Sequence, residues 1–325
     1  MKKRLPAIVL FLLAPTIGEL LSGSSPPSEF FKPFPFLLLA VLYGGGALIV
    51  RELNLRWGGG GRQFMVLAVA YGIVEEGLMA KSFFDPAWMD LGLLATYGRA
   101  LGVNWVWSVN LTVYHMSVSI LVPVLLTQAV FHSRADDRWL GTPTLHFIVF
   151  LFFADVVFGF FLLTPFRPPA ITTLICIAVV VLLVGIARRF TSVSRYETRS
   201  SPSRARWFFL LGFIAMATFF FSCMWALPEA GAPPLVTIGV AVLITAFTWW
   251  LVARMSGQGR LWEDVHRVAF SAGLLLPYIL IAPIREADTT STDDPSGMVI
   301  VAIAFAVLLL VLWLRARRRS RTGGT

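Results

Sequence analysis

The chain has 325 residues, of which 57% are hydrophobic and only 14% are charged, whereas soluble domains carry roughly 25% charged residues. A soluble protein of this length would need more charge and could not bury so much apolar side-chain surface. The net charge of +9 does not indicate nucleic acid binding, because Lys and Arg cluster at the ends of long apolar blocks. The composition therefore predicts an all-α fold, a polytopic bundle of transmembrane helices.

Apolar blocks of a length suited to membrane spans recur along the whole chain. We predict about ten spans, at residues 5–22, 35–50, 63–80, 103–131, 143–164, 170–187, 207–227, 234–253, 267–284 and 298–314. When the chain is threaded alternately through a bilayer, 22 of the 27 Lys and Arg residues fall on one side, and losing or adding one span would destroy this division. By the positive-inside rule, the sequence predicts a cell-membrane protein with both termini in the cytoplasm.

A basic connection separates two membrane halves. We assign residues 1–187 to the half that carries the polar intramembrane residues, 188–206 to a basic cytoplasmic linker, and 207–325 to a second half with a basic tail. The first apolar block resembles a secretory signal, but no clean small-x-small cleavage site follows it. We therefore expect this block to be retained as the first span.

The basic cytoplasmic loops orient the protein and also predict contact with anionic lipid headgroups, at about 1 kcal/mol per residue, beside the contact of the spans with the bilayer. We expect no nucleic acid partner, and the sequence indicates neither a cofactor nor an oligomeric state. The two cysteines, Cys176 and Cys223, lie inside apolar blocks without the spacing of metal ligands. We interpret them as packing residues and expect no metal site.

The third span carries two adjacent carboxylates, Glu75 and Glu76, roughly 18 Å from its cytoplasmic end at about 1.5 Å per residue. An ionisable group at such depth costs about 2.5–3.5 kcal/mol on insertion scales and is a functional candidate by default. We interpret the pair as a proton- or cation-handling site or as a general base. The alternatives are a protonated Glu that is hydrogen-bonded between helices, or neutralisation by Lys81. Glu76 also lies on a small-xxx-small row suited to close helix approach, formed with Ala68, Gly72 and Ala80.

A polar stripe follows the fourth span. At about 100° per residue, five polar side chains fall within an arc of about 80°, namely Asn104, Ser108, Thr112, His115 and Ser119. Such a stripe predicts a wet cavity or a polar seam between helices. His115 is its titratable member, and the plain alternative for a single membrane histidine is an interhelical hydrogen bond.

Two further acidic residues qualify as candidates for the same site. Asp155 in the fifth span shares a face with Gly159, whereas His146 points about 180° away from it at about 100° per residue. Glu19 lies near the outer end of the first span, where an interfacial position would carry a low free-energy cost for a charged side chain. We therefore expect Asp155 and Glu19, but not His146, to join the site.

The segment 81–103 between the third and fourth spans is rich in aromatic residues. It is typical of a turn followed by a helix that lies in the membrane interface. Such a segment could cover a cavity that opens outward. The alternative is that its aromatic rings only belong to the interfacial belt.

Several short runs resemble a family of uncharacterised prokaryotic multi-pass membrane proteins, within roughly the first 130 residues. These runs are Gly18–Pro27, Glu75-Glu76-Gly77 with Ser82–Pro86, Asp90–Gly92 and Gly102–Trp107. The resemblance implies a multi-pass membrane fold and no particular activity. The order of Glu75-Glu76 and His115 also resembles the CAAX-protease-like superfamily of glutamate intramembrane proteases. Here, however, Leu111 replaces the Phe of that pattern, and no Arg follows the Glu pair at the expected spacing.

These observations leave three classes of function open. The first is a transporter-like or small-molecule-binding protein with an intramembrane Glu/His site open to the outside. The second is an intramembrane hydrolase in which Glu75 or Glu76 activates water beside His115. The third is an assembly or scaffold protein whose polar residues merely join helices. Convergence of these three side chains would favour the first two classes.

Overall fold

The computed structural model describes residues 4–190, 203–257, 262–288 and 293–322, and most of the predicted linker lies outside these ranges. Each of the ten predicted spans corresponds to a helix or to a series of continuous helical segments, listed here in chain order. They are α1 and η2 (Leu5–Pro15, Thr16–Leu21); α3, η3 and α4 (Pro33–Leu39, Ala40–Gly44, Gly45–Arg56); α5 and η4 (Gly61–Ile73, Val74–Met79); α6, η6 and α7 (Trp105–Tyr114, His115–Leu121, Val122–Val130); α8 (Thr142–Leu162); α9 (Ala170–Arg189); α10, η8 and α11 (Ala205–Phe219, Phe220–Ala226, Leu227–Glu229); α12 (Pro234–Met255); α13 (Asp264–Ala287); and α14 (Met298–Thr322).

Eight of these helices are long and apolar enough to cross a membrane. The first, Leu5–Leu21, is apolar but shorter. The third, which ends in η4, is not among the eight. It contains three charged residues: Arg62 near its start and Glu75 and Glu76 near its end. The fold is therefore an all-α polytopic bundle with roughly eight to ten spans, which confirms the predicted class.

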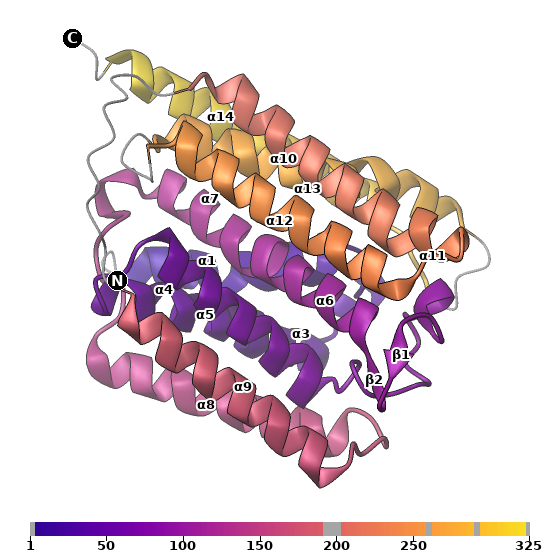
Figure 1. Ribbon diagram of the computed structural model, residues 1–325. Coiled ribbons are helices and arrows are strands. Elements are labelled where there is room, and N and C mark those ends of the chain that lie inside the picture. The colour runs from indigo at the N-terminus through magenta and orange to yellow at the C-terminus, as the bar shows by residue number, and fades with distance from the viewer. Residues whose placement is uncertain (1–3, 191–202, 258–261, 289–292, 323–325) are drawn as a thin grey trace.

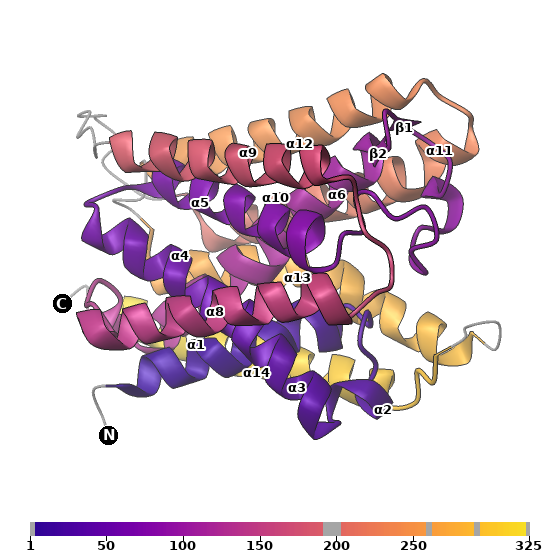
Figure 2. The same cartoon turned by 90° about the horizontal axis from the view of Figure 1, so that it is seen from below.

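The helices pack around a central one formed by α6, η6 and α7. In Figure 1, α8 and α9 run along one side of this helix, and α10, α12, α13 and α14 run along the other. The view from below in Figure 2 shows α8 and α9 in front of the central helices. The long helices on the two outer sides turn large apolar side chains outward, such as Val181 on α9 (65% exposed) and Leu243 on α12 (68% exposed). These surfaces are where the protein contacts the bilayer.

α1 begins and α14 ends at one end of the bundle, which we call the terminal end. The other end, which we call the loop end, carries the shorter elements. These are α2 (Pro27–Phe30), the 3-10 turn η5 (Gly92–Leu94), α11 and the strands β1 (Arg99–Ala100) and β2 (Val103–Asn104), which pair antiparallel. The segment 81–103 is therefore a chain of turns with η5 and a small hairpin rather than the expected interfacial helix.

Two large apolar cores hold the bundle together. The first joins residues of the first half, for example Leu48 on α4 with Leu67 on α5. The second combines both halves, because Ile17 on η2 packs with residues such as Phe270 on α13. α13 is also packed against α7. The division into halves at residues 188–206 stays a prediction.

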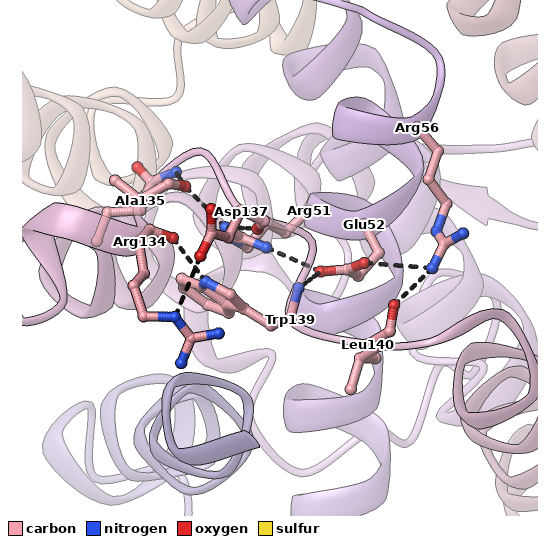
Figure 3. Close-up of polar contacts among 9 residues, drawn as sticks. Arg51, Glu52, Arg56, Arg134, Ala135, Asp137, Trp139 and Leu140 are labelled. Carbon is pink, nitrogen blue, oxygen red and sulfur yellow. Dashed lines mark hydrogen bonds and ion pairs between the residues drawn. The ribbon is translucent and has the colours of Figure 1, made fainter. Parts of the chain in front are cut away.

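At the terminal end, the end of α4 is bound to the connection between α7 and α8, which includes the turn η7 (His132–Arg134). Figure 3 shows this contact, which we call the α4 cluster and which comprises Arg51, Glu52, Arg56 and Trp139. Arg51 and Glu52 form a buried ion pair at 2.8 Å, and the Arg51 guanidinium lies 3.2 Å from the centroid of the Trp139 ring. Arg51 also donates to the carbonyl oxygens of Ala135 and Asp137, and Arg56 to that of Leu140. Arg51 and Arg56, which follow the predicted second span, thus anchor this connection to the end of α4.

Candidate functional site

A cavity of about 900 Å³ extends from the loop end into the middle of the bundle. Near the loop end it is bordered by Glu29, by residues 88–94 of the segment 81–103, and by Arg285. Deeper in the bundle it is bordered by Glu75, Glu76 and His115, with Glu19 beside them. The cavity therefore connects the loop end with the ionisable residues singled out from the sequence.

Every π-helical segment in the described part of the chain contributes to the wall of this cavity. These segments and their lining residues are η2 with Glu19, η3 with Tyr43, η4 with Glu75 and Glu76, η6 with His115, and η8 with Met224. A π-helical turn shifts the side chains that follow it and is frequent at functional sites. Five shifted turns around one cavity are best explained by a requirement to place these side chains.

His115 lies between the two adjacent glutamates of η4. Its Nε2 atom is 2.8 Å from Oε1 of Glu76, and its Nδ1 atom is 3.0 Å from Oε2 of Glu75. We call these residues the Glu–His–Glu group. All three are buried, and their nearest ligand atoms lie within 4.8 Å of one another, an arrangement found nowhere else among the described residues. Sequence spacing gave no sign of a possible metal site here.

A chain of hydrogen bonds fixes the orientation of this group. Trp107 donates its indole N–H to Ser82 Oγ at 3.0 Å, and Ser82 in turn donates to Oε2 of Glu76. The other oxygen of Glu76 faces Nε2 of His115, so an ionised Glu76 selects the imidazole form with a proton on Nε2. Nδ1 can then accept from Ser119 Oγ at 3.1 Å, or carry a second proton toward Glu75. The group can thus gain or lose one proton without moving a helix.

Glu19 lies next to the Glu–His–Glu group and has hydrogen-bond partners of its own; the ring of Tyr43, which contacts it, is 6.0 Å from that of His115. One of its oxygens accepts from the Tyr43 hydroxyl, and the other accepts from Ser25 Oγ at 2.7 Å. Gly18 permits this arrangement, since a Cβ atom there would lie 2.6 Å from the Tyr43 ring. Gly72 lets α5 approach α6, because a Cβ at Gly72 would lie 3.3 Å from Thr112 Cα. The small-xxx-small row predicted on the third span lies at this contact.

Negative charge is in excess around the cavity floor. Three carboxyl groups, those of Glu19, Glu75 and Glu76, surround a single imidazole. Within the described ranges, none of them forms an ion pair with Lys or Arg. Lys81, the alternative counter-charge, donates to the carbonyl oxygens of Phe160 (2.7 Å) and Thr164 (3.4 Å) instead. Arg285 donates to the carbonyl oxygen of Ser22.

Three other candidates from the sequence are not brought to the cavity. Asn104 caps α6 by accepting from Trp107 N–H and donates to the carbonyl oxygen of Leu94. Ser108 donates to the carbonyl oxygen of Asn104. The polar side chains that precede His115 in the stripe therefore form hydrogen bonds mostly within their own helix. Asp155 is buried on α8, and neither of its carboxyl oxygens has a hydrogen-bond partner, but it does not border the cavity.

Some site residues were not found from the sequence. Tyr43 and Ser82 contact the carboxylates from other elements, and neither stands out in an apolar span or a turn. Trp107, for which the sequence left an interfacial position open, is buried and donates into the site. Only the aromatic richness of the segment 81–103 hinted at the role of Trp88 in bordering the cavity.

Comparison with known proteins identifies the family of the chain. The sequence model of a family described as "Uncharacterized membrane protein family" matches residues 8–324, so the chain belongs to this family. No curated protein and no solved structure matches the chain. Membership confirms the resemblance to an uncharacterised multi-pass family and a location in a membrane, and it assigns no activity.

Proposed function

We propose that this member of the uncharacterized membrane protein family is a transporter-like, solute-binding protein. Its solute is a small, partly apolar molecule that carries a positive charge. The observation that carries the proposal is the cavity of about 900 Å³ that leads from the loop end to three carboxyl groups at mid-bundle, which share a single imidazole. Cavities that bind small molecules typically measure roughly 300–1,000 Å³ and combine apolar walls with a few placed polar groups.

The walls and floor of the cavity favour a cation with apolar parts. Aromatic side chains border it from several elements, among them Trp88, Tyr114 and Trp225. Aromatic faces attract organic ammonium groups, with about 2 kcal/mol or more when the contact is desolvated. Below them, the surplus carboxylates supply opposite charge. Glu19 is the best-defined partner for the solute, because Tyr43 and Ser25 hold its carboxyl group in place.

The charge pattern of the loops gives the direction of access. Among the described residues, most Lys and Arg lie at the terminal end, which favours the cytoplasm for this end. The loop end, and with it the mouth of the cavity, then faces outward. A solute would then reach Glu19 from outside.

The test is thermal unfolding of the purified protein with matched ligands. Benzyltrimethylammonium and its neutral isostere neopentylbenzene differ chiefly in charge. At about 100 times its dissociation constant, the cation should stabilise the protein by about 2.7 kcal/mol, which corresponds to roughly 5 °C in Tm for a chain of this size class. We expect no comparable shift with the neutral isostere.

Two variants make this test specific. Glu19→Gln should abolish the shift by the cation, because the solute loses its charged partner. Asp155→Asn is the matched control, since Asp155 is a buried carboxyl outside the cavity wall, and it should keep the shift. Equal shifts by both ligands, or a shift that survives Glu19→Gln unchanged, would contradict the proposal.

A second candidate function, an intramembrane hydrolase, is favoured by the direct contact of Glu76 with His115 at 2.8 Å. A carboxylate and an imidazole at this distance can share the proton movements of general acid–base catalysis. This candidate predicts turnover of fluorogenic amide or ester probes by the wild type. Turnover should fall at least about 100-fold in Glu76→Gln, and absence of turnover with every probe would leave the solute-binding function as the better account.

A further inference from the structure

We infer that the Glu–His–Glu group binds one divalent transition-metal ion of the zinc type at the floor of the cavity. The inference goes beyond solute binding, and the two can fail separately. Glu75, Glu76 and His115 offer two carboxylates and one imidazole, which are common zinc ligands. One ligand atom from each lies within 4.8 Å of the others, and the residues are 3%, 8% and 2% exposed.

The charge of the group matches a divalent ion. Glu75 and Glu76 contribute two negative charges when ionised, and a neutral imidazole contributes none. Holding them bare in a low-dielectric interior is costly, and no Lys or Arg side chain in the described part of the chain pairs with them. A divalent ion would neutralise the pair and leave Glu19 as the single carboxylate that meets the solute.

Two buried side chains contact the Glu75 carboxylate. Nδ1 of His115 lies 3.0 Å from its Oε2 atom. The buried hydroxyl of Tyr71 faces the same carboxylate. Tyr71 lies one helical turn before Glu75, and its ring packs edge-on against the ring of His115 with centroids 6.4 Å apart. Tyr71 and His115 together thus hold the Glu75 carboxylate beside the imidazole, in the position of a metal ligand.

The surroundings resemble those of an accessible metal site rather than a closed structural one. Three protein ligands leave a fourth position, which would face the cavity and could take water or solute. The hydrogen bond from Ser82 orients the Glu76 carboxylate from behind, as the supporting partners of metal ligands do. Imidazole and carboxylate ligands suit Zn²⁺, Mn²⁺ or Co²⁺ better than a soft ion such as Cu⁺.

Metal binding can be measured on the full chain, purified without a histidine tag and stripped with a chelator. After addition of Zn²⁺ and desalting, elemental analysis should find one zinc per wild-type chain. His115→Ala and Glu75→Gln should bind zinc more weakly by a factor above the roughly 10–100-fold typical of residues that only support a ligand. Glu19→Gln and Asp155→Asn should each keep one zinc.

Two further measurements separate loss of the site from loss of the fold. His115→Cys should restore binding of Co²⁺ and add a sulfur-to-cobalt charge-transfer band that the wild type lacks. Stripped wild type should still be stabilised by benzyltrimethylammonium, so a failure of the metal site would leave the proposed function standing. Wild type without zinc, or zinc retained equally by His115→Ala, would overturn the inference.

Discussion

The α4 cluster and the Glu–His–Glu group both bury charged side chains, but only the second borders a cavity. In the α4 cluster, Glu52 faces the guanidinium groups of Arg51 and Arg56 at 2.8 and 3.6 Å, and Trp139 stacks on Arg51. Backbone groups of the neighbouring connection add hydrogen bonds, and the backbone N–H of Trp139 donates to Glu52. The two guanidinium groups share the Glu52 carboxylate, and Asp136 and Asp137 of the connection add negative charge near Arg51.

The Glu–His–Glu group has no such balance, because its carboxylates outnumber the one imidazole between them. The comparison teaches that burial of charge alone does not mark a functional site. A buried cluster whose charges are matched within the chain connects parts of the fold. A buried cluster with surplus negative charge beside a cavity is suited to bind a proton, a metal ion or a solute. Substitutions in the two clusters should therefore change stability in opposite directions.

The largest effect is expected from Glu52→Gln. Arg51 is 2% exposed and Glu52 0% exposed, so the substitution leaves a buried guanidinium without its partner. Breaking one side of a buried pair costs about 3–5 kcal/mol, and thermal unfolding of the purified variant should show a large fall in Tm. The control is Asp137→Asn, which removes a more exposed partner of Arg134 and should cost less than about 1 kcal/mol. Similar losses of unfolding free energy in both variants would contradict the distinction between the buried Arg51–Glu52 pair and the exposed Arg134–Asp137 pair.

Glu75→Gln should have the opposite sign in the metal-free protein. The amide keeps the shape of the side chain and removes one uncompensated charge at membrane depth. Since such a charge costs about 2.5–3.5 kcal/mol on insertion scales, stability should stay constant or rise by up to about that amount. Thermal unfolding in the presence of a chelator measures this. A loss comparable to that of Glu52→Gln would mean that Glu75 is a structural partner of His115 and not a surplus charge.

The sequence predicted the bundle well, because long apolar blocks and clustered arginines depend only on local composition. Helix ends were less accurate. The second span was expected at 35–50, but its helix continues to Arg56. The apolar block ends before Arg51 and Glu52, yet these charged residues stay helical because the connection around Trp139 buries them. Hydropathy alone does not predict this contact between the end of α4 and the connection around Trp139.

The candidate site was predicted in part for a related reason. The cost of burying charge singled out Glu75, Glu76, His115 and Glu19, all of which border the cavity. A regular helix would turn the adjacent Glu75 and Glu76 side chains about 100° apart, whereas both contact His115 from the π-helical turn η4. Partners such as Tyr43 depend on packing between distant segments and on shifted turns. A regular period of 3.6 residues does not describe these.

A smaller effect should come from Trp139→Phe in the α4 cluster. Phenylalanine keeps an aromatic face for Arg51 but loses the indole N–H, which donates to the carbonyl oxygen of Arg134 at 2.8 Å. The weaker cation–π contact and the lost hydrogen bond together should cost about 1–2 kcal/mol. Binding of benzyltrimethylammonium should not change. A variant that unfolds normally but no longer binds the cation would show that the two clusters are coupled.

The smallest effect concerns Lys81, which lies just beyond η4. Burial, and then the positive charge of Arg167, lower the pKa of its amine below the ordinary 10.5. Between the lowered pKa and 10.5 the unfolded chain binds more protons than the folded one, so stability should rise with pH in that window. Lys81→Met should lack this rise in thermal unfolding scans. If Lys81 instead neutralised Glu75 or Glu76, its pKa would be raised and stability would fall as pH passed it.

The central claim is that a water-accessible cavity leads from the outer face to the carboxylates. Cysteine accessibility tests it most directly, in a chain whose two buried cysteines, Cys176 and Cys223, are replaced by alanine. Leu111→Cys places a thiol on the cavity wall, and Ile120→Cys places one in the packed core as the control. The probe is a membrane-impermeant, cationic methanethiosulfonate reagent.

The account predicts rapid labelling of Leu111→Cys in right-side-out vesicles, slowed by benzyltrimethylammonium, and no labelling of Ile120→Cys. Labelling of Leu111→Cys only in inside-out vesicles, or no faster than that of Ile120→Cys, would contradict it.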